Sequence, residues 1–464
     1  MSITIGAAVF LCALIARHTP HLEGRVRSAS WNTGDVLYSL QAPAVTVMAA
    51  AALIALAMAG GIALLDRRAA NRYRRSGDAG STPLAPRVVM ERTRGIHAGQ
   101  MTVTVLVPAH NEEASLPATL ESLRWQTHAP HRVVVVADNC TDRTAELARL
   151  HGAEVIETRG NTAKKAGALN QALREILPGH GDNDAILVMD ADTRLDPRFL
   201  QVALRRMSDD RALMAVGGLF LGEEGHGPIG QFQRNEYLRY CRTLGRRRGR
   251  VFILTGTATV FRPRALRAVA STRGTILPGE AGNVYDTMAL TEDNELTIAL
   301  KSLGGLMVSP PECTVVTELM PGWRTLWHQR LRWQRGALEN IGAYGITPPT
   351  LRYWAQQIGI GYGVIALGSY FAALLVMLVA LDHWVWFPFW LGIGLVFMAE
   401  RVWTVWHGGW RARLTAALVF PELAFDMFLN LAYLRGVMDS ALGRSAAWRH
   451  VAHTIPASDF EKAV

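Results

Sequence analysis

The sequence predicts an α/β domain with a mostly parallel sheet, flanked along the chain by transmembrane α-helices. Three observations predict it. Apolar runs typical of buried strands, TVTVLV (102–107), RVVVVA (132–137) and AILVM (185–189), alternate with helix-like segments. Polar residues follow each of these runs directly. The 464 residues are 50% hydrophobic, which is high for a soluble protein and indicates a membrane part.

Residues 1–75 are predicted to be an N-terminal membrane segment with a basic flank. Residues 3–16 are apolar but short for a span, so they form either a short first helix or a retained signal-like segment. Residues 42–65 are 24 residues without a charge, enough to cross about 30 Å of bilayer. The basic run at 66–75 follows, so the positive-inside rule predicts a cytoplasmic location from there onward. Residues 76–99 are predicted to be a linker.

The net charge of +9 favours a membrane surface over nucleic acid, because arginine clusters stand beside apolar runs. No nucleic-acid partner is therefore predicted. The four cysteines lie far apart, with no CxxC pair and no histidine partner at zinc-site spacing. Neither a disulfide framework nor a structural zinc site is predicted. The cysteines are Cys12, Cys140, Cys241 and Cys313.

Residues 100–320 are the predicted α/β domain. Helical patterns lie near 112–125, 142–151, 164–177 and 196–207. Ligands of such sheets bind beyond the carboxyl ends of the strands, so the polar segments found there mark the expected site. These segments are PAHNEE at 108–113, DNCTD at 138–142 and DAD at 190–192.

The stretch AILVMDADT at 185–193 carries the clearest local signal. A buried strand ends by presenting Asp190 and Asp192, and carboxylates at positions i and i+2 of an extended segment point the same way. Both can then face one divalent cation, or a diphosphate bound through it. The alternative is an acidic turn after a core strand. The sequence has no GxxxxGK[ST] loop and no GxGxxG after TVTVLV, which disfavours P-loop and NAD-type Rossmann enzymes.

Seven motifs, in the same order, resemble those of membrane-embedded family 2 glycosyltransferases, the group that contains cellulose, chitin, hyaluronan and poly-N-acetylglucosamine synthases. The resemblance covers about residues 105–340 and implies a GT-A type fold. It also implies a nucleoside-diphosphate sugar donor, most often a UDP-sugar, and Mg²⁺ or Mn²⁺. The motifs are PAHNEE, ADNCTDRT (137–144), AKKAGALN (163–170), VMDAD (188–192), TGTATVFR (255–262), TEDNELT (291–297) and QRLRW (329–333).

The resemblance implies roles for individual residues. Asp293, with Glu292 beside it, matches the catalytic base motif. Asp190 and Asp192 match the metal ligands. Acceptor binding is implied for Thr255, Gly256 and Trp333. Donor binding is implied for Pro108, Ala109, Glu112, Asp138, Lys165, Asp190, Gln329, Arg332 and Trp333.

Several of these residues also have a purely structural explanation. Asp138 is also suited to an Asx turn after a strand, and Lys165 to a solvated helix face. Thr291 is suited to cap a helix whose acidic first turn, including Asp293, is favoured by the helix dipole. Inverting transfer needs a base, however, and no histidine of the domain stands in a comparable motif. Asn139 departs from the many relatives that have a second acid there.

Residues 321–352 are predicted to lie in the membrane interface. In its first part, residues 321–345, tryptophans and leucines are interspersed with four arginines, as in a basic amphipathic helix. Anchoring alone would explain this pattern. It does not exclude function, because the arginines can contact a diphosphate bidentately and Trp333 can stack on a sugar.

Residues 353–436 are predicted to hold three further membrane helices, before a tail at 437–464. The third carries Glu422 and Asp426 and has basic residues on both sides. It is therefore either re-entrant, or it spans with its acids facing a path lined by protein. The three segments are Ile358–Leu381, Trp384–Val402 and Leu414–Leu434.

The reading that accounts for most of these features is an inverting, metal-dependent glycosyltransferase of the plasma membrane with a cytoplasmic catalytic domain. It would transfer sugar to a glycan or lipid-linked acceptor, with or without polymerising and secreting a polysaccharide. Non-processive transfer of single sugars to a lipid or other membrane acceptor is the alternative within this class. A non-catalytic, membrane-anchored nucleotide-sugar binding or scaffold protein is the alternative outside it, and the intact Asp293 argues against that.

Overall fold

The computed structural model describes residues 99–247, 249–380 and 388–444, with five isolated helical positions between 53 and 64. Apart from these five positions, the predicted helices at 3–16 and 42–65, the basic flank and most of the linker and tail lie outside the described residues. The chain divides into two compact units. The larger holds residues 72–359 and 428–464, and the smaller holds residues 1–71 and 360–427.

The larger unit is built on a seven-stranded sheet of strand order β3-β2-β1-β4-β8-β6-β9. Neighbouring strands pair in parallel except at β8, which is antiparallel to both β4 and β6. The predicted mostly parallel sheet is thus confirmed. The strands are β1 (Thr102–Ala109), β2 (Arg132–Ala137), β3 (Glu154–Glu157), β4 (Asp184–Met189), β6 (Leu213–Gly217), β8 (Ala258–Phe261) and β9 (Leu306–Val308).

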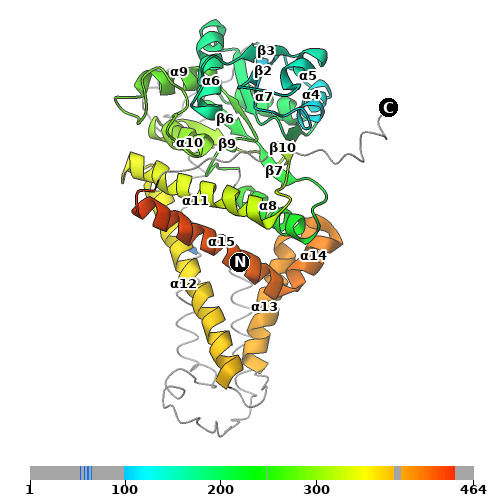
Figure 1. Cartoon of the computed structure of the whole chain (residues 1–464), viewed down its shortest axis with the longest axis vertical. Coiled ribbons are helices and arrows are strands. Elements are labelled where there is room, and N and C mark those ends of the chain that lie inside the picture. The colour runs from blue at the N-terminus through cyan, green and yellow to red at the C-terminus, as the bar shows by residue number, and fades with distance from the viewer. Residues whose placement is uncertain are drawn as a thin grey trace. The chain divides into compact units, whose positions relative to one another are not determined.

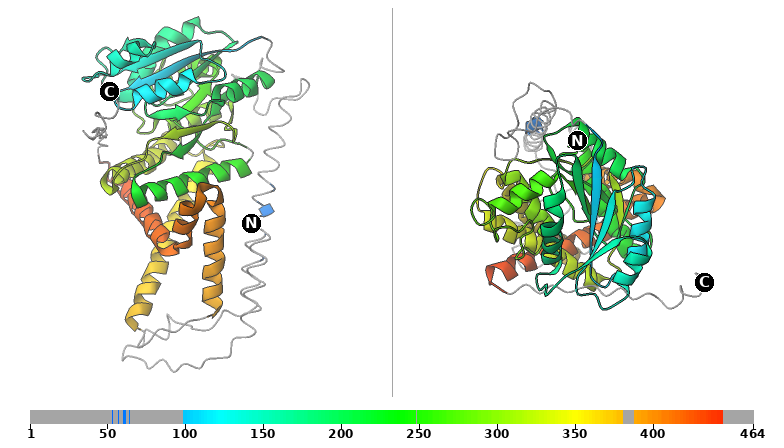
Figure 2. Two further views of the ribbon diagram at one scale, coloured as in Figure 1. Left: turned by 90° about the vertical axis from the view of Figure 1, so that its right-hand side faces the viewer. Right: turned by 90° about the horizontal axis from the view of Figure 1, so that it is seen from above.

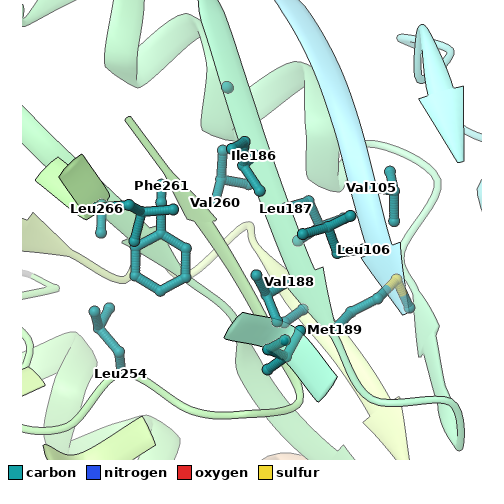
Figure 3. Packing of buried hydrophobic residues seen from close by; sticks show 14 of the residues in the cluster. Val105, Leu106, Ile186, Leu187, Val188, Met189, Leu254, Val260, Phe261 and Leu266 are labelled. Atoms are coloured by element: carbon teal, nitrogen blue, oxygen red, sulfur yellow. The ribbon is translucent and has the colours of Figure 1, made fainter. Parts of the chain in front are cut away.

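The two central strands are buried on both faces. Every residue of β1 after Thr102 and every residue of β4 after Asp184 is buried. Helices flank both faces of the sheet (Figure 2), which explains why these strands are continuous apolar runs without alternation. Side chains of β1, β4 and β8 pack together in this core, as Figure 3 shows for Leu106, Leu187 and Val260.

Four helices lie close to their predicted ranges, and others were not predicted. The sequence patterns near 112–125, 142–151, 164–177 and 196–207 correspond to α4 (Leu116–Arg124), α5 (Thr144–Leu150), α6 (Lys164–Ile176) and α7 (Phe199–Asp209). The short 3-10 helix η1 (Leu177–Gly179) follows α6. The elements α8 (Gly227–Arg246), α9 (Pro263–Thr272) and α10 (Glu292–Ser302) complete this part of the domain.

A second, three-stranded sheet of order β5-β10-β7 fixes the segment that leaves β4. Its members are β5 (Thr193–Leu195), β7 (Leu219–Gly222) and β10 (Thr314–Thr317). Thr193, which directly follows Asp192, pairs with Thr317 of β10. This pairing holds the two aspartates between two sheets, so their direction is set from both sides.

The predicted interface segment forms α11 (Trp323–Tyr344), which lies beside α8 at the lower side of the domain in Figure 1. Phe428, where α15 (Val419–Ala441) enters the larger unit, packs edge-on against Trp323 and Trp327, with ring centroids 5.1 and 5.5 Å apart. The aromatic residues of the segment therefore have protein partners in addition to any membrane role.

The apolar helices differ in part from their prediction. α12 (Leu351–Ala380) begins before the predicted span and includes Leu351–Val376, a stretch long and apolar enough to cross a membrane. α13 (Pro388–Thr404) covers the described part of the second span. The third predicted span, Leu414–Leu434, is not one continuous helix. α14 (Gly409–Ala417), preceded by η2 (Trp406–Gly408), meets α15 at a bend of 90°.

The acids of this third segment are explained by pairing within the smaller unit. Arg401 of α13 contacts Glu422 at 3.0 Å and also pairs with Asp426. Glu422 is buried. Their charges are thus compensated locally, as is expected of ionisable residues in an apolar helical bundle.

A buried ion pair fixes α10 against the loop that precedes it. Arg273 contacts Glu295 through two hydrogen bonds of 2.7 and 2.9 Å, and both side chains are at most 1% exposed. Arg273 also donates to the carbonyl oxygens of Pro278 and Val284. Tyr344 of α11 donates to Glu295 at 2.5 Å.

Glu295→Gln is expected to lower the free energy of unfolding by about 3–5 kcal/mol, because it leaves the buried charge of Arg273 uncompensated. Tyr344→Phe removes one hydrogen bond and is expected to cost about 1 kcal/mol. Chemical denaturation of the purified chain in detergent measures both. Equal small losses in the two variants would contradict the role assigned to the ion pair.

Candidate active site

A cavity of about 1050 Å³ opens at the carboxyl ends of β1, β2 and β4. Every site residue predicted from the sequence lines it, although these residues are spread from position 108 to position 333. They are Pro108, Ala109, Glu112, Asp138, Lys165, Asp190, Asp192, Thr255, Gly256, Glu292, Asp293, Gln329, Arg332 and Trp333. The three strand ends therefore converge as the sequence predicted.

Asp190 and Asp192 follow β4 in a tight turn. The N–H of Asp190 donates to the carbonyl of Thr257 at 3.2 Å, and Asp192 accepts a hydrogen bond from Thr193 Oγ1 at 3.1 Å. The segment is thus a turn after a core strand, and its acids also face the cavity. Burial, followed by the negative charges of Asp190, Glu112 and Glu318, raises the pKa of Asp192 to about 7.

The two aspartates fit a divalent cation that arrives with a phosphorylated ligand. Within 99–247, 249–380 and 388–444, no three His, Cys, Asp or Glu side chains gather closely enough to hold a metal alone. Mg²⁺ is commonly bound by one or two carboxylates, with phosphate oxygens and water completing its shell. Burial is the main cause of the raised pKa of Asp192, and the neighbouring carboxylates add to it; a bound cation would offset the repulsion between these carboxylates.

Lys165 lies between the end of β4 and the start of α10. Its Nζ contacts Asp190 Oδ1 at 2.5 Å and Glu292 Oε1 at 3.0 Å. Burial alone would lower the pKa of Lys165, but the charges of Asp190 and Glu292 raise it well above its ordinary value. The alternative of a solvated helix face is therefore wrong for this residue.

Gly256 allows these charged groups to approach one another. A Cβ atom at this position would lie 3.1 Å from Lys165 Nζ and 3.5 Å from a carboxylate oxygen of each of Asp190 and Asp293. Three charged groups thus surround one backbone position. Only a residue without a side chain leaves this space free, which gives a physical reason for glycine in the TGTATVFR motif.

Asp293 is held at the first turn of α10. Its carboxylate accepts the N–H of Gly256 at 2.9 Å and of Asn294 at 2.7 Å. Burial and the charge of Glu292 raise the pKa of Asp293 to about 6. Burial also acts to raise the pKa of Glu292, but the charges of Lys165 and Arg332 outweigh it and lower that pKa.

Thr291 does not cap α10 through its side chain, which corrects the capping alternative. It occupies the N-cap position without a side-chain hydrogen bond to the helix. Its side chain instead accepts a hydrogen bond of 3.1 Å from Asn340 of α11. The acidic first turn remains compatible with the helix dipole.

Asp138 is held by side chains of the loop before α6. Its Oδ1 accepts hydrogen bonds from Thr158 at 2.8 Å and from Asn161 at 2.7 Å, so it does not form the Asx turn considered as an alternative. Asn139 donates to the carbonyl of Asn161 at 3.0 Å and has a φ of 51°. The amide that replaces a second acid therefore helps to order this loop.

The structure adds residues of α8 that the sequence analysis missed. Glu236, Tyr237 and Tyr240 line the cavity beside α11. Arg330 donates to Glu236 at 2.8 Å, and its guanidinium lies 4.3 Å from the centre of the Trp333 ring. The QRLRW motif of α11, which contains Arg330, is recognisable in the sequence, but α8 contains none of the recognised motifs. Only its amphipathic pattern could have indicated that it covers the site.

Comparison with known proteins gives a family match over part of the chain. Residues 104–270 match the family model for Glycosyl transferase family 2. The chain is 29% identical over 245 residues to a probable glycosyltransferase, YdaM, of Bacillus subtilis (strain 168), covering 50% of this chain and 54% of that protein. It is 27% identical over 258 residues to a β-monoglucosyldiacylglycerol synthase of Synechocystis sp. (strain ATCC 27184 / PCC 6803 / Kazusa). That match covers 52% of this chain and 49% of the synthase. The match therefore spans about half the length of these curated relatives.

A solved structure resembles a larger part of the chain. It is the mannosyltransferase PcManGT of Pyrobaculum calidifontis in complex with GDP-Man and Mn²⁺, at 18% identity and a TM-score of 0.51. The likeness covers 84% of this chain and 98% of that chain. It concerns the fold alone, and it confirms the expected GT-A type architecture.

Asp293→Asn is expected to gain stability relative to the wild type as the pH rises. The folded-state pKa of about 6 lies above the ordinary 3.8. The stabilising contribution of this proton is therefore full below about pH 4 and is lost as the pH rises through about 6. Asparagine has no such proton. The Tm of the variant minus that of the wild type should be larger at about pH 8 than at about pH 4, and a difference independent of pH would contradict this.

Proposed function

We propose that this chain, which carries a glycosyltransferase family 2 domain, is an inverting, metal-dependent glycosyltransferase. It would transfer a sugar from a nucleoside-diphosphate sugar to a glycan or lipid-linked acceptor at the membrane. The main supporting observation is that two carboxylates approach Gly256 in one cavity: Asp190, and the partly buried Asp293 with its raised pKa. A base and a diphosphate site have to lie this close for direct transfer.

The reaction follows from these positions. Asp293 takes the proton of an acceptor hydroxyl while that oxygen forms a bond to the anomeric carbon of the donor sugar. The bond from this carbon to the diphosphate breaks, its electron pair leaves with the diphosphate, and attack from the opposite face inverts the configuration. A pKa near 6 suits a base that must be ionised at neutral pH and still accept a proton.

The donor would lie between the strand ends and α11. Asp138 is suited to bind the nucleoside, and Arg332 and Gln329 to contact the diphosphate from α11. Asp190 and Asp192 would hold Mg²⁺ or Mn²⁺, which neutralises the leaving diphosphate. PcManGT was solved with GDP-Man and Mn²⁺, which agrees with this chemistry. A UDP-sugar is the proposed donor for this chain.

The proposed location is the plasma membrane, with the catalytic domain in the cytoplasm. α12 supports the membrane part of this proposal, because it exposes large apolar side chains such as Ile358, Ile365 and Leu375, as a lipid-facing helix does. Trp333, Thr255 and Gly256 would line the acceptor side. The second candidate, single transfer to a lipid, is favoured by the β-monoglucosyldiacylglycerol synthase among the relatives.

Asp293→Asn tests the proposed base. Turnover should fall about a hundredfold or more, while donor binding stays near that of the wild type, because a base acts in the transition state. Diphosphate release across nucleotide sugars gives the rate, and calorimetry gives donor binding on the same sample. Asp209→Asn, an exposed change at the end of α7, is the matched control. Transfer retained by Asp293→Asn would remove the base, and loss of both binding and Tm would indicate a structural role.

Asp192→Asn tests the metal. Donor affinity and turnover should fall together, and the chain should bind Mn²⁺ more weakly, because one of two carboxylate ligands is lost. The core of β4 is untouched, so the Tm should not fall. Full transfer in excess EDTA, or unchanged Mn²⁺ binding by the variant, would exclude the proposed site.

A further inference from the structure

Lys301 is a charged residue that does not line the catalytic cavity and takes no part in the reaction above. It stands near the C-terminal end of α10, and its Nζ donates to the carbonyl oxygens of Val251 at 3.0 Å and Phe252 at 2.7 Å. It also donates to the hydroxyl of Tyr353 at 2.7 Å. The Tyr353 hydroxyl in turn donates a hydrogen bond to the carbonyl of Phe252 at 2.5 Å. Lys301 thus has three acceptors for the three N–H bonds of an ammonium group.

The same face of α10 carries two further contacts to this neighbouring segment. Positions 293, 297 and 301 are four residues apart and lie on one side of a helix. Gly256 N–H donates to Asp293 at 2.9 Å, and Leu254 N–H donates to Thr297 Oγ1 at 2.9 Å. Lys301 adds the third contact, to the carbonyls at 251 and 252. The segment 251–256 is thus attached to α10 at three successive turns.

This segment ends in the active site. Ile253, Thr255 and Gly256 line the catalytic cavity, and Gly256 is the backbone position that Asp293, Asp190 and Lys165 surround. A shift of 251–256 along α10 would therefore move the N–H that orients the Asp293 carboxylate. The contact of Lys301 lies at the far end of the segment, away from the substrate.

Lys301 also attaches α12 to this arrangement. Phe252, Ile298, Ile341 and Tyr353 form one buried cluster, contributed by the segment, α10, α11 and α12. The ammonium lies 4.9 Å from the ring centre of Tyr353 and 5.4 Å from that of Phe252. Tyr353 is the third residue of α12, so the apolar helix begins at this contact.

A lysine is a costly residue in this place. Burial lowers the pKa of Lys301 well below its ordinary value, and the positive charges of Arg352 and Arg250 lower it further. An apolar side chain of similar length would avoid this cost, but it would also remove the hydrogen bonds to the carbonyls of Val251 and Phe252. The hydrogen bonds of Lys301 to the segment 251–256 therefore offset the cost of its burial.

We propose that Lys301 is a positioning residue for the base Asp293. It acts by holding the segment 251–256 in a fixed register with α10, and its hydrogen bond to Tyr353 connects this segment to the start of α12. The inference rests on the proposed function. It predicts that loss of the ammonium lowers turnover without weakening donor binding, because no substrate contact is removed. A misplacement of about 1 Å far from the reacting atoms can cost about a hundredfold in rate.

The experiment compares Lys301→Met and Tyr353→Phe in the full chain, purified in detergent. Lys301→Met keeps the length of the side chain and removes the charge and the hydrogen bonds, and Tyr353→Phe keeps the ring and removes the hydroxyl. Tyr362→Phe, an exposed position on α12, is the matched control. The measurements are kcat, donor binding by calorimetry, Tm, and amide hydrogen exchange of residues 251–257.

Lys301→Met is expected to lower kcat about tenfold or more, to leave donor Kd within about twofold, and to speed exchange at 251–257. Tyr353→Phe should show a smaller change of the same kind, and Tyr362→Phe none. An unchanged kcat with a lower Tm would make Lys301 merely structural and overturn the proposal. Unchanged exchange at 251–257 would overturn it as well. A wild type that binds donor but transfers to no acceptor would instead refute the proposed function, and exchange would still report on the Lys301 contact.

Discussion

The ammonium group of Lys165 makes the arrangement of the site possible, because it separates carboxylates that would otherwise repel one another. It stands between Asp190 at the end of β4 and Glu292 at the start of α10, two elements that are far apart in the sequence. A like-charge cluster in a partly enclosed cavity would otherwise be unfavourable. Lys165 keeps Glu292 ionised, and burial together with the charge of Glu292 raises the pKa of the neighbouring Asp293, which is the property a base needs.

The remaining parts of the larger unit keep these groups in place from several directions. The antiparallel β8 follows the loop of Gly256, and pairing between β5 and β10 directs the segment of Asp190 and Asp192. The buried pair of Arg273 and Glu295 holds α10 two residues beyond the proposed base. Because most of these contacts are made by buried side chains or by backbone, they define the geometry without occupying the space that a substrate needs.

Three arginines form ion pairs that join separate elements of the described chain. Arg273, Arg330 and Arg401 each pair with a carboxylate on another element, and each such pair joins segments that no local pattern connects. A buried charge without a partner is costly, so these pairs specify which elements may pack together. In the smaller unit the pairing of Arg401 with Glu422 and Asp426 accounts for the acids of an apolar helix. The sequence alone had left two explanations for these acids, a re-entrant segment or a span whose acids face a path lined by protein.

The sequence by itself determined the three apolar strands, the acids at their ends and the motif residues around the cavity, because burial on both faces and turn chemistry are local properties. Only the tertiary structure decided that Lys165 contacts Glu292, that Glu236 of α8 supports Arg330, and that a bend at Leu418 interrupts the predicted third span. The short strands β5 to β10 were also missed, since three to five residues give too little periodicity to recognise. Contacts between distant elements leave no local pattern in a single sequence, because each depends on how the whole chain packs.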